Sequence, residues 1–461
     1  MVTVLGANSV TGGYEVENSV RLDGVNDYLN FTNSAGNRRT WTYSTWVKRS
    51  KLINDKHVFF ENNTGNNDAG YMQFRFQEAE VINLTGYNTD WLTTDRVFRD
   101  LSAWYHIVLA VDTTNSTAGN RLRLYVNGVE ETSFSVDNNP DEDEDLPLNL
   151  NNSVTYIGAG GGGSNRFFNG YMAETVLIDG LQLTPTSFGE FDEDSGIWKP
   201  IDVSGLTRGT NGFYLDFKAS GNLGNDAFGD TDLTEANLAA VNQSTDTCTN
   251  NFATWNPLFR KGTTTPAFTE GNLKSTFDDT GANEFALTTF GVSAGKWYAE
   301  VKWTANTGTA ATATGILDMA YTGTADPNDA VTNAFGYFGS GTKNVSGTAS
   351  SYGNSYADGN IVGIAIDMDN NKLYFSKNGT FQNSGDPTTG ATGTGAIAIV
   401  AGVTYGIFAT DYNNQVAELN TGSPAFSGTD KADGNGFGSF EYEPPSGYLA
   451  ICTKNLAENG G

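Results

Sequence analysis

The segment Arg121–Val136 constrains the fold of this chain more than any other stretch. Leu122, Leu124 and Val126 alternate with residues that tolerate solvent. This period of two is what a strand with one buried face requires, because successive side chains point to opposite faces of a sheet. Asn127-Gly128 follows directly, and both residues tolerate the positive φ angles of a tight type I′ turn. The segment therefore predicts a β-hairpin.

The sequence around this hairpin predicts further strands. Trp104–Asp112 is a nearly continuous apolar run that ends in an acidic turn, a composition typical of a strand covered on both faces. Gly170–Asp179 follows after glycine-rich turns, and a hairpin pattern like the first recurs at Asn371–Phe381. We therefore expect an all-β chain with two related antiparallel β-sandwiches.

Size and charge narrow the class of protein. A chain of 461 residues exceeds the size at which a single core usually stops growing, so at least two domains are expected. The net charge of -27 would repel phosphate backbones and anionic lipids, which argues against nucleic acid and membrane partners. The acidic excess is explained either by a solvated surface or by binding of divalent cations.

Cysteine usage and the start of the chain bear on compartment. Cys248 and Cys452 cannot form a disulfide framework, so reduced thiols are the default and their pairing stays open. Residues 1–10 lack the basic and apolar regions of a signal peptide. No run in the sequence approaches the ~20 apolar residues of a membrane-spanning helix. We expect folding in a cytoplasm.

Several segments within residues 19–186 carry a family resemblance through their order and spacing. These segments are Arg21–Tyr28, Trp41–Lys48, Trp104–Val108, Leu124–Gly128, Phe168–Glu174 and Leu181–Thr184. Together they resemble a laminin-G-like domain of the concanavalin-A-like superfamily. The resemblance implies a two-sheet antiparallel jelly roll.

A second resemblance covers residues 266–442, which are similar to a SPRY domain, another β-sandwich. It rests on Gly295–Trp303, Gly359–Asp369, Leu373–Gly379 and Tyr405–Ala409. The stretch 305–355 departs from this pattern, and we expect a loop there because it is rich in Thr, Ala and Gly.

The remaining segments are expected to connect or flank the two sandwiches. Residues 1–18 are expected to form an N-terminal arm and 443–461 a C-terminal tail segment. Residues 187–265 keep an aromatic alternation, so we expect an ordered connector rather than a flexible linker. Trp198, Trp255 and Phe259 are expected to pack between the domains.

The whole architecture resembles structural proteins of tailed bacteriophages, especially marine ones. The resemblance is carried by Phe188–Phe191, Asn251–Leu258 and Gly438–Leu456. It implies a virion surface protein assembled in the bacterial host cytoplasm: a tail-fibre component or adhesin that binds host surface glycans. The alternative is a capsid-decoration or head-fibre protein that binds other virion proteins, which the shortness of the 1–18 arm favours somewhat. We expect a homo-oligomer in either case.

Catalysis is not expected, and no catalytic residue is assigned. A glycoside hydrolase needs two carboxylates facing one sugar, and the nearest candidate run, Glu190–Asp194, falls outside the first sandwich. The histidines are His57 and His106, too few for a convincing catalytic triad, and His106 lies within an apolar strand that suits a core residue. A glycan hydrolase stays a distant alternative.

Two segments suit carbohydrate binding, which uses aromatic ring faces and short polar groups on loops. The first supplies Tyr87, Asp90 and Trp91, and the second supplies Arg166 and Phe167. The competing interpretation is that Trp91 and Phe167 pack at sandwich edges or against another subunit.

The acidic run 141–145 supplies the metal candidates Asp141, Asp143 and Asp145. Ca²⁺ takes six to eight oxygen ligands from such loops, but this run lacks the glycine spacing of a dedicated calcium loop. We therefore favour a solvated acidic loop, require no cofactor, and keep calcium as a candidate ligand.

Overall fold

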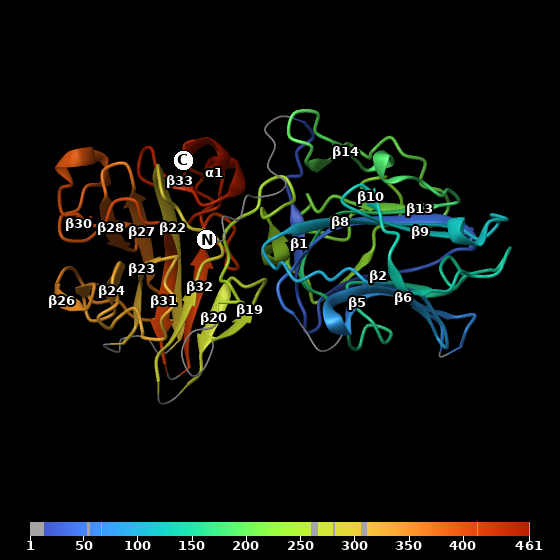
Figure 1. The fold of residues 1–461 in the computed structure, drawn as a ribbon, viewed down its shortest axis with the longest axis horizontal. Helices are drawn as coiled ribbons and strands as arrows, with labels where there is room; N and C mark the ends of the chain where they lie inside the picture. The colour runs from blue at the N-terminus through green and yellow to red at the C-terminus, as the bar shows by residue number, and fades with distance from the viewer. Residues whose placement is uncertain are drawn as a thin grey trace. The chain divides into compact units, whose positions relative to one another are not determined.

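A computed structural model describes the chain except for residues 1–12, 53–55, 66, 260–265, 280–281, 306–310, 413 and 461. Most of the predicted N-terminal arm therefore lies outside the described residues. The chain divides into two compact units, a first unit within Val10–Thr249 and a second from Asn250 onward. Each unit contains two sheets (Figure 1), antiparallel apart from the short β33 (Leu449–Ala450) beside β22 (Lys296–Ala305), which confirms the predicted all-β class. Within the described residues, no helix is both long and apolar enough to cross a bilayer.

One sheet of the first unit runs in the order β10-β9-β8-β3-β13-β1-β18, with β16 beside β13. Neighbouring strands are antiparallel. The bounds are β1 Ser19–Asp23, β3 Thr40–Arg49, β8 Trp104–Asp112, β9 Leu122–Val126, β10 Val129–Glu130, β13 Asn169–Asp179, β16 Phe213–Leu215 and β18 Gln243–Ser244.

The other sheet of the first unit runs in the order β11-β7-β6-β5-β4-β12-β2-β17. Figure 1 shows β2, β5 and β6 in one layer and β8, β9 and β13 in the other. The bounds are β2 Tyr28–Thr32, β4 His57–Asn63, β5 Tyr71–Gln77, β6 Val81–Gly86, β7 Asp90–Thr94, β11 Phe134–Asp137, β12 Val154–Ile157 and β17 Thr234–Ala236. A separate ribbon pairs β14 Gly189–Phe191 with β15 Trp198–Pro200.

The core of the first unit lies between these two sheets. On β5, Met72, Phe74 and Phe76 are buried in it, and Trp41 and Tyr43 on β3 meet them from the opposite sheet. Each such side chain contributes roughly 1.5–3 kcal/mol through removal of apolar surface from water. Because side chains alternate along a strand, the intervening β5 residues point away from the core, to the outer face of their sheet.

The hairpin predicted within Arg121–Val136 is confirmed. β9 pairs with β10 across Asn127 and Gly128, whose φ angles of 49° and 78° are those of a type I′ turn. The hairpin ends at Glu130, and the chain then crosses to the other sheet, where β11 pairs with β7. The second hairpin repeats this design between β28 and β29, with φ angles of 48° at Asn378 and 76° at Gly379.

Residues 187–249 pair with strands of the first unit. β16 joins β13, β17 joins β2 and β18 joins β1. Trp198 donates from Nε1 to His106 Nδ1 at 2.9 Å, and His106 Nε2 is 2.9 Å from Ser44 Oγ. Since Nδ1 accepts, the ring proton resides on Nε2, and burial lowers the pKa of His106 to about 3. His106 is thus a neutral core residue, as its apolar strand predicts.

The second unit also has two sheets, in the orders β19-β20-β32-β22-β27-β28-β29 and β21-β31-β23-β24-β25-β26. β30 pairs with β28, and β33 pairs with β22. The bounds are β19 Ala267–Thr269, β20 Lys274–Phe277, β21 Glu284–Leu287, β22 Lys296–Ala305, β23 Ala313–Asp318, β24 Ala334–Phe338, β25 Thr342–Val345, β26 Thr348–Ser351, β27 Ile361–Asp367, β28 Lys372–Lys377, β29 Thr380–Phe381, β30 Ile397–Ala398, β31 Tyr405–Asp411, β32 Gln415–Asn420 and β33 Leu449–Ala450.

The expectation of a loop over residues 305–355 is wrong, because β23 to β26 lie within it. The small residues of this stretch allow neighbouring strands to pack closely and do not form a loop. A Cβ at Gly315 would lie 1.9 Å from the carbonyl oxygen of Phe335 on the neighbouring strand, so this position excludes any side chain.

Trp255 and Phe259 make their described contacts within the second unit. Trp255 is fully buried in its core, and the Phe259 ring is 5.5 Å from that of Phe285. The hydrogen bond from Trp198 to His106 lies within the first unit.

The helical elements are η1 Glu78–Glu80, η2 Ala118–Asn120, η3 Pro185–Ser187, η4 Ala240–Asn242, η5 Pro387–Thr392 and α1 Thr453–Asn459.

Candidate functional site

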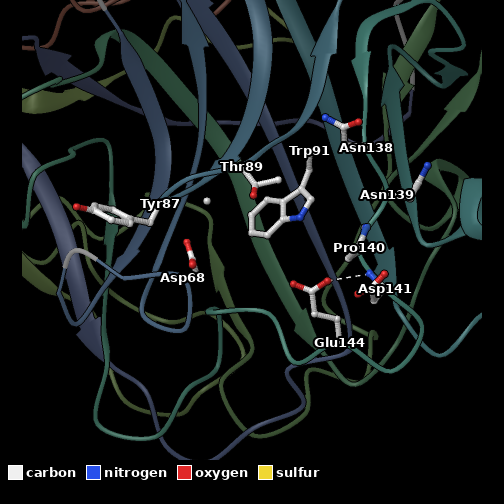
Figure 2. A pocket seen from close by; sticks show the side chains of 10 residues that line it. Asp68, Tyr87, Thr89, Trp91, Asn138, Asn139, Pro140, Asp141 and Glu144 are labelled. Carbon is white, nitrogen blue, oxygen red and sulfur yellow. Dashed lines mark hydrogen bonds between the residues drawn. The ribbon is translucent and has the colours of Figure 1, made fainter.

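A pocket of about 210 Å³ lies at one end of the first unit's sandwich. Figure 2 shows Tyr87 and Asp68 on one side of it, the 138–144 segment on the other, and Trp91 between them. The lining residues are Asp68, Gly86, Tyr87, Thr89, Trp91, Asn138, Asn139, Pro140, Asp141 and Glu144. The pocket thus joins the two neighbourhoods that the sequence indicates separately, the Tyr87–Trp91 segment and the acidic run.

The turn between β6 and β7 presents Tyr87. Gly86 N donates to Thr89 O at 2.7 Å and closes the turn, while Asn88 Nδ2 donates to Asp68 Oδ1 at 3.1 Å. The Tyr87 side chain is 47% exposed, which is unusual for a residue of its size and leaves a ring face available to a ligand.

Trp91 is positioned by a register shift between β6 and β7. Thr85 pairs with Asp90 and Leu84 with Leu92, so Trp91 is the extra residue of a β-bulge. Its side chain is only 6% exposed and belongs to the core cluster. A Cβ on Gly86 would lie 2.9 Å from the Trp91 ring, so the glycine makes room for it. Trp91 therefore forms a fixed wall of the pocket.

The polar side chains of the pocket include three carboxylates, those of Asp68, Asp141 and Glu144. Asn138 attaches its segment to β7, since its N donates to Trp91 O at 2.7 Å and its Nδ2 to Asp90 O at 3.0 Å. Glu144 Oε2 accepts from Asp141 N at 2.8 Å. Asn139 Oδ1 is buried and has no hydrogen-bond partner within the part of the chain that the structure describes. The carboxylates of Asp68, Asp141 and Glu144 in the lining favour a ligand that donates hydrogen bonds, as sugar hydroxyls do.

Two of the three metal candidates of the acidic run contact one arginine in the structure. Arg39 Nε contacts Asp145 Oδ1 at 2.6 Å, and Arg39 Nη1 contacts Asp143 Oδ1 at 3.0 Å, whereas Asp141 lines the pocket. Among the described residues, no group of three or more His, Cys, Asp or Glu side chains is arranged to hold a metal ion. Arg39 therefore supplies the positive charge that a calcium ion would otherwise bring to this loop.

We expect calcium to have no effect on the stability of the first unit. Chelation with EDTA, followed by addition of millimolar Ca²⁺, should leave the melting temperature unchanged because two of the three candidate carboxylates already face Arg39. Differential scanning calorimetry checks this, and a rise of several degrees with Ca²⁺ but not with Na⁺ of equal ionic strength would contradict it.

The other glycan candidates lie on the outer face, beyond the lining of the pocket. Arg166 Nη1 donates to Tyr71 Oη at 3.0 Å, and the Tyr71 ring is 6.5 Å from the Tyr87 ring. The Phe167 ring stacks on Tyr28 at 6.3 Å and 28°. Tyr71 thus links the pocket to the 165–168 segment, so both candidate segments belong to one surface. Asp90 is exposed beside it, with Oδ1 accepting from Asn83 Nδ2 at 3.1 Å.

The carboxylates considered for glycoside hydrolysis face a lysine instead of a cleft. Lys199 Nζ lies 3.3 Å from Glu190 Oε1 and 3.2 Å from Asp192 Oδ2. Asp192 Oδ1 also accepts from Ser195 N at 2.9 Å. This arrangement stabilises the β14–β15 ribbon and gives these carboxylates a structural role.

Several pocket residues escape the sequence analysis. Asp68 is an ordinary surface acid in sequence, and its position depends on Asn88. Glu144 belongs to the acidic run 141–145 but is not among its metal candidates, and the fold of the 138–144 segment places it in the pocket. The pair Asn138-Asn139 before Pro140 gives a weak signal, because short amides between strands often line ligand sites.

Comparison with known proteins agrees with this fold. The first unit is a two-sheet antiparallel jelly roll with a pocket at one end, the class of lectin-like sandwiches. Residues 23–186 match the family model described as the concanavalin A-like lectin/glucanases superfamily, so this segment forms a concanavalin-A-like domain. No match to a curated protein was found.

Three solved structures illustrate the structural neighbours. The SPRY domain of human HERC1 is 17% identical with a TM-score of 0.25, covering 32% of this chain and 87% of its own. A candidate carbohydrate-binding protein from Bacteroides ovatus is 16% identical with a TM-score of 0.33, covering 49% and 61%. A heptameric SAP-like pentraxin from Limulus polyphemus is 16% identical with a TM-score of 0.28, covering 37% and 80%. We base no conclusion on these likenesses.

Proposed function

We propose that the chain is a non-catalytic glycan-binding protein displayed on a bacteriophage virion, where the first unit contacts host surface carbohydrate. The observation that carries the binding role is the pocket, which is lined by the exposed Tyr87 ring and by the polar side chains of Asp68, Asn139 and Glu144. A sugar ring has an apolar face for the tyrosine and hydroxyl donors for the acceptors. The virion location rests on the sequence resemblance and belongs to the same proposal, as does a homo-oligomeric state.

Tyr87→Ala should weaken glycan binding by about tenfold, since loss of one stacked ring is worth about 1–2 kcal/mol. The fold should be unaffected because the side chain is 47% exposed. Trp91→Ala is a poorer test, since it would open a cavity in the core. Binding is measured on an array of bacterial surface polysaccharides, with retained circular dichroism as the check on folding.

Phe191→Ala is the matched control, because this side chain is also about half exposed, at 49%, and lies on the separate β14–β15 ribbon. It should leave binding unchanged. Equal binding by wild type and Tyr87→Ala would show that the pocket is not the site. If wild type binds no glycan on the array, the adhesion role is wrong, and the capsid-decoration alternative is then tested by antibody labelling of particles.

A further inference from the structure

Arg75 lies on the outer face of the first unit's second sheet and is nevertheless buried. It alternates with the core residues of β5, as do Tyr71 and Gln73. Its side chain is 8% exposed. The glycine-rich segment 158–168 lies over the neighbouring Gln73, since a Cβ at Gly160 would be 2.6 Å from Gln73 Nε2. Glu61 on β4 fixes that segment, since its two carboxylate oxygens accept from Gly161 N at 2.9 Å and Gly162 N at 2.8 Å.

The same segment carries Arg166 to the neighbourhood of Arg75. Arg166 O accepts from Val58 N at 3.3 Å, and its backbone adopts a φ of 55°, a left-handed conformation that turns the chain back over the sheet. Burial lowers the pKa of Arg75, and the positive charge of Arg166 lowers it further, while Tyr71 and Asp90 oppose both effects. Tyr71 interacts with both guanidinium groups, since it accepts a hydrogen bond from Arg166 Nη1 and raises the pKa of Arg75.

The hydrogen bonds described for these two guanidinium groups go to neutral acceptors. Arg75 Nη1 donates to Gln73 Oε1, and Arg166 Nη1 donates to Tyr71 Oη at 3.0 Å. Arg75 Nε is buried without a hydrogen-bond partner among the described residues. The ion pairs described for arginines in this unit involve Arg39, Arg49, Arg96, Arg121, Arg123 and Arg208.

The acids nearest this arginine pair are already bonded. Glu61 accepts from Gln73 Nε2 at 2.7 Å and from Asn63 Nδ2 at 3.0 Å, in addition to the two backbone amides. Asp90 accepts from Asn83. In a chain with 53 acidic and 26 basic residues, a buried Arg75 and a half-buried Arg166 that both donate to neutral groups are unusual, because guanidinium groups are normally neutralised by carboxylates when buried.

Aromatic rings flank the arginine pair on both sides. Tyr71 and Tyr87 lie on the side of the pocket. On the other side the Phe167 ring stacks on Tyr28, and the Tyr28 and Tyr156 rings are 5.8 Å apart. We propose that Arg75 and Arg166 form an anion subsite on this surface, and that it selects glycans carrying a carboxylate, such as uronic acids. The planar fork of Arg166 matches a carboxylate, and the flanking rings accept the adjoining sugars.

This inference rests on the proposed glycan-binding function, and one array separates the two. The array carries, for each polysaccharide backbone, its neutral, uronic acid and sulfated forms. Wild type should bind the uronic acid forms at least tenfold more tightly than the neutral forms. Its binding to the uronic acid forms should weaken as NaCl is raised from 50 to 500 mM. Arg166→Gln should lose that preference while keeping residual binding. Arg123→Gln, which removes an arginine paired with Glu130 on the opposite sheet, is the matched control and should retain it.

The possible results separate the two proposals. Equal binding of neutral and uronic acid forms by wild type overturns the anion subsite but leaves the proposed function standing. Preference for sulfated over carboxylated forms overturns the assignment to uronic acids. Absence of binding to every form overturns both proposals. The comparison between glycan forms uses wild type alone, so a folding defect in Arg166→Gln would not affect its outcome.

Discussion

Asp246→Ala should destabilise the first unit by about 3–5 kcal/mol, the usual cost of breaking a buried ion pair from one side. Asp246 Oδ2 lies 2.7 Å from Lys48 Nζ, with side-chain exposures of 1% and 2%. Its other oxygen accepts from Trp104 Nε1 at 3.0 Å. The substitution would leave a buried ammonium and a buried indole N–H without the carboxylate that both now contact.

The loss of stability should come from the attachment of residues 244–249 to the sandwich. Asp246 follows β18, whereas Lys48 is on β3, so the pair attaches residues 244–249 to the sandwich. Hydrogen exchange of amides within residues 13–249, followed against urea concentration, reports the loss for this unit apart from the other.

The double variant Lys48→Met/Asp246→Leu is the control. It removes both charges and fills their space with apolar side chains of similar volume, so it should recover most of the stability that Asp246→Ala loses. A loss below about 1 kcal/mol in Asp246→Ala, the range of exposed pairs, would mean that the carboxylate does not neutralise Lys48 in solution.

The sequence predicts local patterns of this fold well. The two hairpins are predicted because their information is local: strand alternation and an Asn-Gly pair at 127–128 and 378–379 are enough. His106 is likewise correctly placed in the core, because its apolar neighbours describe its strand. The error over residues 305–355 has the opposite origin, since Gly315 is small for close contact with a strand that is distant in the sequence.

The candidate site is harder to predict because it depends on contacts between distant residues. Trp91 is buried through a bulge against β6, and a bulge leaves no mark in the alternation of a single strand. Asp143 and Asp145 face Arg39, more than a hundred residues earlier. Arg75 has the sequence pattern of an exposed strand residue, yet its side chain is only 8% exposed. A period of two shows which face a residue is on, but not what covers that face.

Glu174 gives the first unit a pH dependence opposite to that of a surface acid. It is the residue at a register shift in β13, and its Oε2 accepts from Tyr214 Oη at 2.7 Å and from Tyr14 Oη at 3.4 Å. Burial raises the pKa of Glu174 from 4.5 to about 7; the Tyr214 hydrogen bond opposes this rise and the charge of Asp216 adds to it.

The Glu174 carboxyl binds its proton more tightly in the folded state than in the unfolded chain. The contribution of Glu174 to stability should therefore be greatest below pH 4.5. It should then fall as the pH rises from 4.5 to about 7. The full effect is about 3 kcal/mol, from about 1.36 kcal/mol for each pKa unit.

Glu174→Gln stays neutral and should remove this slope, whereas Glu190→Gln, at an exposed glutamate, should keep the wild-type profile. Urea unfolding of the three proteins between pH 4.5 and 8 measures the difference. Parallel profiles for wild type and Glu174→Gln would mean that Glu174 is ionised in the folded state, with its charge stabilised by the two tyrosine hydroxyls.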